Sequence, residues 1–130
     1  MAFAYDVVSP ERKLASGEAD AVQIPGAEGD LTAMPNHAPF LTTLRPGVVK
    51  VRSGNETTEF VVTGGFVEVS PESAAVLAEE AVTPSEADAA WFEAKIEAAE
   101  AMHAAAEGEA KIIAAQRIND FRFLKEQLGA

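Results

Sequence analysis

Cysteine is absent from the 130 residues, which excludes disulfides and thiolate metal sites and fits a cytoplasmic setting. Long apolar runs are absent too, because no window reaches the roughly 18 apolar residues that a membrane-spanning helix needs. The opening residues, Met1 to Asp6, show neither the basic segment nor the apolar core of a signal peptide. We therefore expect a chain that is neither secreted nor inserted into a bilayer.

Positive charge is scarce, with 10 basic against 21 acidic residues and a formal net charge of −11. Such a chain repels nucleic acid and anionic lipid headgroups. Twelve acidic and five basic residues precede Pro84, and nine acidic and five basic residues follow it, so neither part is basic. The expected partner is another protein.

The sequence also lacks the motifs of common catalytic sites. It contains no Gly-x-x-x-x-Gly-Lys-Ser/Thr loop for phosphate and no Gly-x-Ser-x-Gly turn for a nucleophile. A metal ion needs three or four converging ligands, yet the two histidines, His37 and His103, fall in parts of different character. We expect no enzyme activity, no cofactor and no metal site.

Residues 1–84 have the pattern of short strands separated by turns. A Gly, Pro or Asn signal recurs about every ten residues, and Val49 and Val51 alternate with Lys50 and Arg52. Gly54-Asn55 suits a tight hairpin, and Gly64-Gly65 suits a bulge or a close backbone approach. This predicts a β-sandwich of about ten short antiparallel strands. The clearest runs are Phe3 to Ser9, Ala21 to Ile24, Phe40 to Leu44, Val48 to Arg52, Thr57 to Thr63, Phe66 to Ser70 and Ala74 to Ala78.

Residues 85–130 change to a helical period. Thr83-Pro84-Ser85-Glu86 resembles a capped helix start. Small residues then recur at steps of three and four, and Gly108 interrupts the pattern before a second helical run. We predict an antiparallel helical hairpin in residues 85–130, packed through Ala87, Trp91, Ala94, Ala98, Ala101 and Ala105 on one helix and Ile113, Phe121, Leu124 and Leu128 on the other.

Three motifs, in order along the chain, resemble the epsilon subunit family of F-type ATP synthases. They are Ile24-Pro25-Gly26-Ala27-Glu28-Gly29-Asp30-Leu31, then Pro35-Asn36-His37-Ala38-Pro39-Phe40-Leu41-Thr42, and Gly64-Gly65-Phe66-Val67-Glu68-Val69. The resemblance covers nearly the whole chain, and the spacing of the motifs is more specific than any one of them.

This resemblance implies a non-catalytic rotor subunit of the bacterial enzyme, peripheral to the cytoplasmic face of the inner membrane. In the family the sandwich grips the central stalk (gamma) subunit and rests on the membrane-embedded ring of proton-carrying subunits. The acidic turn and the His-Ala-Pro loop are placed at the ring end. The implied ring contacts are Glu28, Gly29, Asp30, Asn36, His37, Ala38 and Pro39. A purely structural turn remains an alternative for these residues.

The hairpin departs from the family at one informative position. Many bacterial relatives bind ATP through Ile/Leu-Asp-x-x-Arg-Ala, but the matching stretch here retains Asp88 and has Trp91 in place of the arginine. Losing a bidentate cation from a triphosphate site removes a contact worth about 2 kcal/mol. We therefore predict little or no ATP binding, with Trp91 as a packing residue.

Four cations lie on the second helical run: Lys111, Arg117, Arg122 and Lys125. In relatives such residues can meet acidic segments of the catalytic beta subunits when the hairpin extends, which blocks ATP hydrolysis. A solvated helix face with local ion pairs explains them equally well. A different class of protein also remains open, namely a free-standing β-sandwich that binds a ligand and dimerises through its helical tail.

Overall fold

The computed structural model describes residues 3–27, 29–36 and 38–130. The chain divides into two compact units, one ending at Thr83 and one beginning at Pro84. Each unit is described by itself below. No helix among the described residues is long and apolar enough to cross a membrane.

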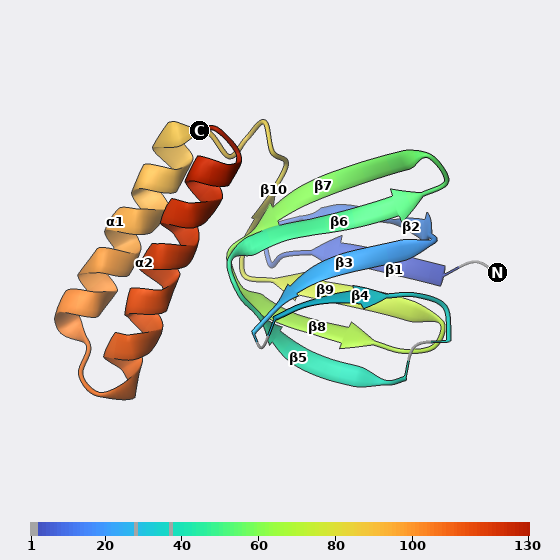
Figure 1. Cartoon of the computed structure of the whole chain (residues 1–130), viewed down its shortest axis with the longest axis horizontal. Coiled ribbons are helices and arrows are strands. Elements are labelled where there is room, and N and C mark those ends of the chain that lie inside the picture. Colours follow the sequence, from blue (N-terminus) through green and yellow to red (C-terminus); the bar gives the residue numbers. More distant parts are fainter. Residues whose placement is uncertain (1–2, 28, 37) are drawn as a thin grey trace. The chain divides into compact units, whose positions relative to one another are not determined.

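The first unit contains ten strands that form a nearly closed sandwich (Figure 1). The strands are β1 (Phe3–Val8), β2 (Lys13–Ala19), β3 (Ala21–Gly26), β4 (Gly29–Ala33), β5 (Phe40–Leu44), β6 (Gly47–Ser53), β7 (Glu56–Val62), β8 (Gly65–Val69), β9 (Ser73–Ala78) and β10 (Ala81–Val82). Their order is β10-β7-β6-β3-β5-β8-β9-β1-β2, and β4 pairs with β3. The predicted sandwich of about ten strands is confirmed.

One pairing differs from the antiparallel prediction. β1 and β9 run parallel, with Val7 opposite Val76, whereas the other pairs are antiparallel. A parallel pair cannot be joined by a tight turn, and here most of the sandwich separates the two strands along the chain. Sequence periodicity reports which face of a strand is buried, not the direction of its neighbour, so this pair was not predictable from the pattern.

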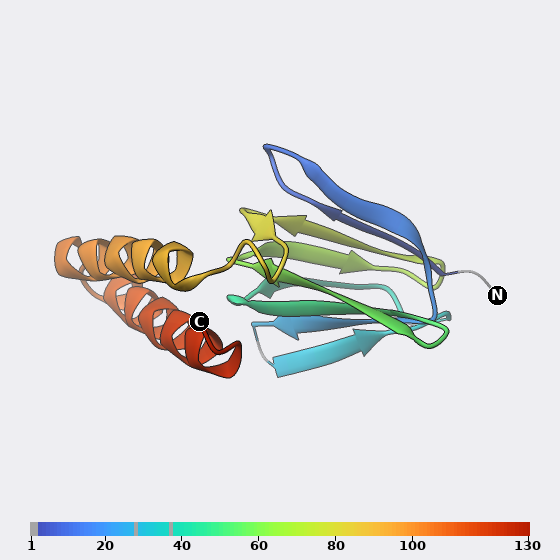
Figure 2. The same ribbon diagram turned by 90° about the horizontal axis from the view of Figure 1, so that it is seen from above.

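Figure 2 shows the strands of the sandwich in two layers. Alternate residues of the strands are buried in the interior. In β6, Val49 and Val51 are buried, while Lys50 and Arg52 point to the outer face, as the alternation predicts. The core consists of Phe3, Val7, Ala19, Val22, Ile24, Ala33, Leu44, Val49, Val51, Phe60, Val62, Val67, Val69, Ala74, Val76, Ala78 and Ala81. Burial of these side chains is the main stabilising term for the unit.

Three strands were missing from the runs named in the sequence: β2, β4 and β10. In β2 only Ala19 is buried, and in β4 only Ala33 is buried. β10 has just two residues. A strand that contributes one small residue to the core has no strong alternation, so hydrophobic patterning alone misses it.

The conformations of two glycines, Gly54 and Gly65, test what the sequence predicted for the hairpin turn and for Gly64-Gly65. Gly54 has a φ of 62° in the β6–β7 turn, as a tight hairpin requires. At Gly65, with a φ of 125°, an added Cβ would lie 2.2 Å from the Leu77 carbonyl oxygen of β9. Of the two alternatives for Gly64-Gly65, the structure therefore shows a close backbone approach.

The second unit is a hairpin of α1 (Ala89–Ala105) and α2 (Glu109–Gln127). Gly108, with a φ of 64°, separates them as predicted. The predicted start of the first helix at Thr83 and Pro84 is wrong. Asp88 is the N-cap residue, because its side chain accepts a hydrogen bond from the backbone N–H of Trp91 at 2.9 Å.

The predicted apolar stripe of the first helix is confirmed only in part, because Ala87 is buried and Trp91 is half-buried but the other members are not. Ala94, Ala98, Ala101 and Ala105 are exposed, whereas α1 buries Phe92 and Ala99. On α2, Ala114, Phe121 and Leu124 are buried, but the predicted Ile113 is half exposed, at 50%. In a helix so rich in alanine, several stripes fit the spacing equally well. The bulky Phe92 decides which one is buried, since it gains most from leaving water.

Candidate functional site

The predicted contact residues do not form one cluster. Gly29 and Asp30 begin β4, whereas Asn36, Ala38 and Pro39 follow its last residue, Ala33. A five-residue strand spans about 16 Å, so the acidic turn and the His-Ala-Pro loop lie at opposite ends of the sandwich. The prediction of a single end for both loops is wrong. Glu28 and His37 lie outside the described residues.

The end that carries Gly29 and Asp30 is held by backbone hydrogen bonds. The N–H of Arg45 donates to the Pro25 carbonyl at 2.9 Å, and the N–H of Ala27 donates to the Thr43 carbonyl at 2.9 Å. Asp30 and Gly29 are both exposed. This end therefore presents an acidic side chain on a fixed backbone.

At the opposite end, Asn36 has a φ of 69°, a conformation that asparagine tolerates better than most residues. Its N–H donates to the Pro71 carbonyl at 2.8 Å, which ties the loop to the β8–β9 turn. Ala38 and Pro39 are exposed. Asn36 is thus fixed to the sandwich beside the exposed Ala38 and Pro39, in line with both the structural and the contact interpretations of this sequence.

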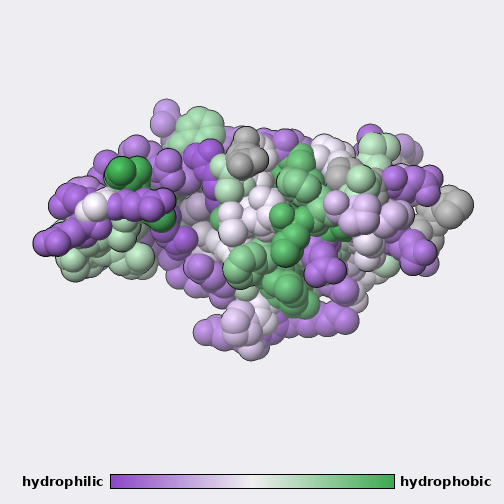
Figure 3. Space-filling model, turned by 90° about the horizontal axis from the view of Figure 1, so that it is seen from below, coloured by the Kyte–Doolittle hydropathy of each residue, from purple (hydrophilic) through white to green (hydrophobic). Residues whose placement is uncertain are grey.

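A further candidate surface lies on the outer side of β1, β9, β8 and β5, which we call the apolar face: Val8, Leu41, Phe66 and Leu77. Phe66 pairs with Leu77, and Leu77 pairs with Val8, so the three form one row across the strands. Leu41, Phe66 and Leu77 are 66%, 53% and 47% exposed. Figure 3 shows apolar side chains gathered on one face of the sandwich.

This face is hollowed where it reaches the Gly29 end. The hollow has a volume of about 420 Å³ and is lined by Val8, Ser9, Pro10, Gly65, Phe66, Leu77, Ala78 and Glu79. A contiguous exposed apolar surface of this kind is typical of a site that another protein covers. Sequence reasoning missed this surface, although the alternation of Phe66 with the apolar Val67 and Val69 could have indicated an outward phenylalanine.

In the hairpin, the residues of the degenerate ATP motif have structural partners. The Asp88 carboxylate caps α1, as described above. The Trp91 ring meets Phe92 edge-on at 5.0 Å and Phe121 of α2 at 6.5 Å, and the Lys95 ammonium lies 5.3 Å from its centre. Trp91 therefore packs the two helices together.

Arg122 and Lys125 of α2 form ion pairs across the hairpin. Arg122 lies 3.5 Å from Glu100, and Lys125 lies 3.7 Å from Glu93, both carboxylates belonging to α1. Arg117 lies over the Phe121 ring at 5.6 Å, and Lys111 is exposed. In the folded hairpin, local interactions thus occupy the cations nearest its C-terminal end.

Among the described residues, no group of three or more histidine, aspartate and glutamate side chains could hold a metal ion. The buried polar side-chain atoms in the part of the chain that the structure describes all have hydrogen-bond partners. The fold therefore defines a class of protein, in which a sandwich of ten strands is followed by a helical hairpin.

Comparison with known proteins gives the family. A family model described as the ATP synthase delta/epsilon chain β-sandwich domain matches residues 2–84. The ATP synthase epsilon chain of Fuscovulum blasticum is 46% identical over 125 residues, which cover 96% of this chain and 95% of the relative. That of Ruegeria sp. (strain TM1040) is 55% identical over 103 residues, covering 79% and 75%. The chain belongs to the ATP synthase epsilon chain family.

Solved structures agree at the level of the fold. A chain of the Euglena gracilis mitochondrial ATP synthase superposes with a TM-score of 0.75 at 21% identity, covering 98% of this chain and 81% of that one. A chain of the Tetrahymena thermophila central stalk and c-ring structure gives a TM-score of 0.69 at 18% identity, covering 97% and 96%. The family match does not favour the free-standing ligand-binding module.

Proposed function

We propose that the chain is a non-catalytic rotor subunit that couples the central stalk of an ATP synthase to the proton-driven membrane ring. The family match carries this proposal, and the apolar face supports it because an exposed apolar surface suits a permanent partner. The partners we propose are the gamma subunit and the ring. The location we propose is the cytoplasmic face of the bacterial inner membrane, as a peripheral protein.

The two partners are assigned to different surfaces. The gamma subunit covers Val8, Leu41, Phe66 and Leu77, and the ring meets Gly29 and Asp30. Gly26 pairs with Leu44 and Leu44 pairs with Gly65, which lines the hollow, so the proposed stalk and ring contacts lie at the same end of the strands. A flat ring cannot meet both ends of a rigid sandwich. The loop of Asn36, Ala38 and Pro39 is therefore assigned to a stalk contact.

Reconstitution tests the proposal. Membranes that lack the chain should regain proton-driven ATP synthesis with the intact protein, and largely with residues 1–84. A double variant, Phe66→Glu with Leu77→Glu, should fail to restore synthesis because it charges the apolar face. Equal synthesis with and without the chain would contradict the proposal.

We also propose that the hairpin restrains ATP hydrolysis when it extends towards the catalytic beta subunits. In the folded state, Arg122 and Lys125 are occupied by Glu100 and Glu93, so extension has to release them. Faster hydrolysis by complexes built with residues 1–84 than by complexes with the full chain is the expected result. An unchanged rate would show that this chain has no such role.

A further inference from the structure

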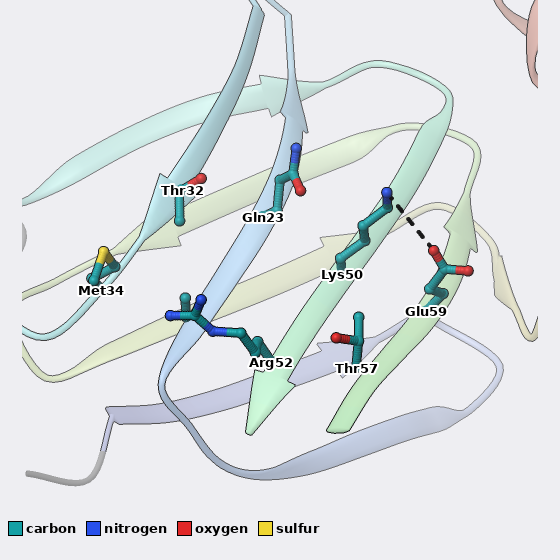
Figure 4. Close-up of a pocket in the computed structure, with 8 residues that line it drawn as sticks. Gln23, Thr32, Met34, Lys50, Arg52, Thr57 and Glu59 are labelled. Atoms are coloured by element: carbon teal, nitrogen blue, oxygen red, sulfur yellow. Dashed lines mark ion pairs between the residues drawn. The ribbon is translucent and has the colours of Figure 1, made fainter. Parts of the chain in front are cut away.

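The outer side of β4, β3, β6 and β7 differs chemically from the apolar face. Two rows of side chains cross the strands there. Thr32, Gln23, Lys50 and Glu59 form one row, and Ala21, Arg52 and Thr57 form the other. Together with Met34 they line a hollow of about 660 Å³ (Figure 4). We call these eight residues the polar face.

Arg52 is the unusual member of this face. Among the described residues no carboxylate pairs with its guanidinium group, although acidic residues outnumber basic ones in this unit. The neighbouring Asp20 carboxylate instead accepts a hydrogen bond from the Gly54 N–H at 2.7 Å. In so acidic a chain, a cation left without a carboxylate indicates a surface suited to an anionic partner.

Lys50 supplies a second, only partly neutralised cation. Its ammonium lies 3.9 Å from Glu59, and the two side chains are 42% and 39% exposed. Figure 4 shows Lys50 directed towards Glu59 and Arg52 directed over the strands towards Met34. One incoming carboxylate can share the Lys50 ammonium with Glu59, and a second can bind Arg52, with which no carboxylate of the described residues pairs.

The spacing of the two cations specifies the partner further. Lys50 and Arg52 are two residues apart on β6, so their side chains leave the same face about 7 Å apart. An extended peptide places the side chains of residues i and i+2 at the same spacing and on one side. Gln23, Thr32 and Thr57 add amide and hydroxyl groups that can bond to its backbone.

We propose that the polar face docks an extended acidic segment of a partner protein, with carboxylates at alternate positions that pair with Lys50 and Arg52. The hollow has the volume of a site for several residues, larger than a single inorganic anion requires. This proposal goes beyond the stalk and ring contacts and does not depend on them.

Titration of the full-length, isotope-labelled chain with two peptides tests it by NMR. Acetyl-Ser-Glu-Ser-Glu-Ser-amide has alternate carboxylates, and acetyl-Ser-Glu-Glu-Ser-Ser-amide has the same composition with adjacent ones. The first should shift the amide signals of Gln23, Lys50, Arg52 and Thr57 and should bind more tightly than the second. Equal affinities of the two peptides, or no shifts at these residues with peptide added up to about 10 mM, would overturn the proposal.

Three variants separate a specific site from general charge attraction. Arg52→Gln should weaken binding about fivefold, whereas Lys13→Gln, with the same charge change on β2, should leave it unchanged. Glu59→Gln should strengthen binding because it removes the carboxylate that competes for Lys50, a gain that misfolding cannot mimic. Equal effects of Arg52→Gln and Lys13→Gln would contradict the proposal. So would tighter binding of ATP than of the alternating peptide at the same residues.

Discussion

At the scale of single residues, two effects disfavour replacing a glycine: a positive φ, and a close contact that the added Cβ would make. Gly54 and Gly65 allow the two effects to be told apart. Gly54 and Gly65 both have positive φ, at 62° and 125°. An added Cβ at Gly54 meets nothing within 4 Å, whereas at Gly65 it meets the backbone of Leu77 at 2.2 Å. Comparing the two positions therefore distinguishes conformational strain at a glycine from steric contact of an added Cβ with a neighbouring strand.

We expect Gly65→Ala to lower the free energy of unfolding by about 2 to 4 kcal/mol, because β8 and β9 must move apart. Gly54→Ala should cost only about 1 kcal/mol, which is the conformational term. Urea unfolding followed by far-ultraviolet circular dichroism measures both. Equal losses for the two variants would show that the β8–β9 approach is not the controlling contact.

Asp88 illustrates how one residue can carry a family motif and a structural role. Since its carboxylate caps α1, Asp88→Ala should destabilise the hairpin by about 1 kcal/mol, and Asp88→Asn should retain most of the stability. The single tryptophan, Trp91, reports hairpin unfolding by fluorescence. If the alanine variant unfolded at the wild-type urea concentration, the capping role would be excluded.

ATP affinity is a separate prediction for the same segment. Trp91 takes the place of the arginine that the family resemblance implies and is packed against Phe121, so no cation occupies that position of the motif. Isothermal titration of the full chain with ATP should therefore show no micromolar binding. A micromolar dissociation constant would mean that other cations of the chain replace the missing one.

At the scale of elements, the hairpin depends on apolar contacts more than on its ion pairs. Arg122 and Glu100 are 58% and 54% exposed, and exposed pairs of this kind contribute about 0 to 1 kcal/mol. Phe121 is buried and touches Trp91. Phe121→Ala should thus cost about 3 kcal/mol.

Arg122→Gln is the matched comparison and should change hairpin stability by less than about 1 kcal/mol. Urea unfolding at low and high salt, monitored through Trp91 fluorescence, measures the stability of both variants. Because Phe121 contacts Trp91, its replacement changes the fluorescence signal, so the unfolding midpoints are compared and the signal amplitudes are not. A larger loss for Arg122→Gln than for Phe121→Ala would reverse this ranking of the two kinds of contact.

The elements also show what the sequence can predict. The alternation in β6, the positive φ of the Gly54 turn and the break between the helices at Gly108 could be predicted from the sequence. The start of α1 could not, because Thr83 and Asp88 are both capping residues and only tertiary packing selects between them. The buried stripe of α1 was ambiguous because alanine fills several faces. The separation of the two loops by β4 was hidden because β4 buries a single alanine.

At the scale of the whole molecule, the sandwich has two outer faces of opposite character. Phe66 and Leu77 lie on an apolar face, and Lys50 and Arg52 lie on a polar face on the other layer. Such a division suits a chain that is held between partners, since each face can bind a different surface. In the proposed rotor role, the sandwich transmits torque through its stiffness and its binding to both partners.

The most direct test of this account is a photo-crosslink in the assembled ATP synthase. A photoreactive phenylalanine analogue at position 66 should form an adduct with the gamma subunit, and the same analogue at position 123, on α2, serves as the comparison. We predict a gamma adduct from position 66 in actively synthesising membranes. Failure of position 66 to crosslink to any subunit, while the complex remains intact, would contradict the assignment of the apolar face to the stalk.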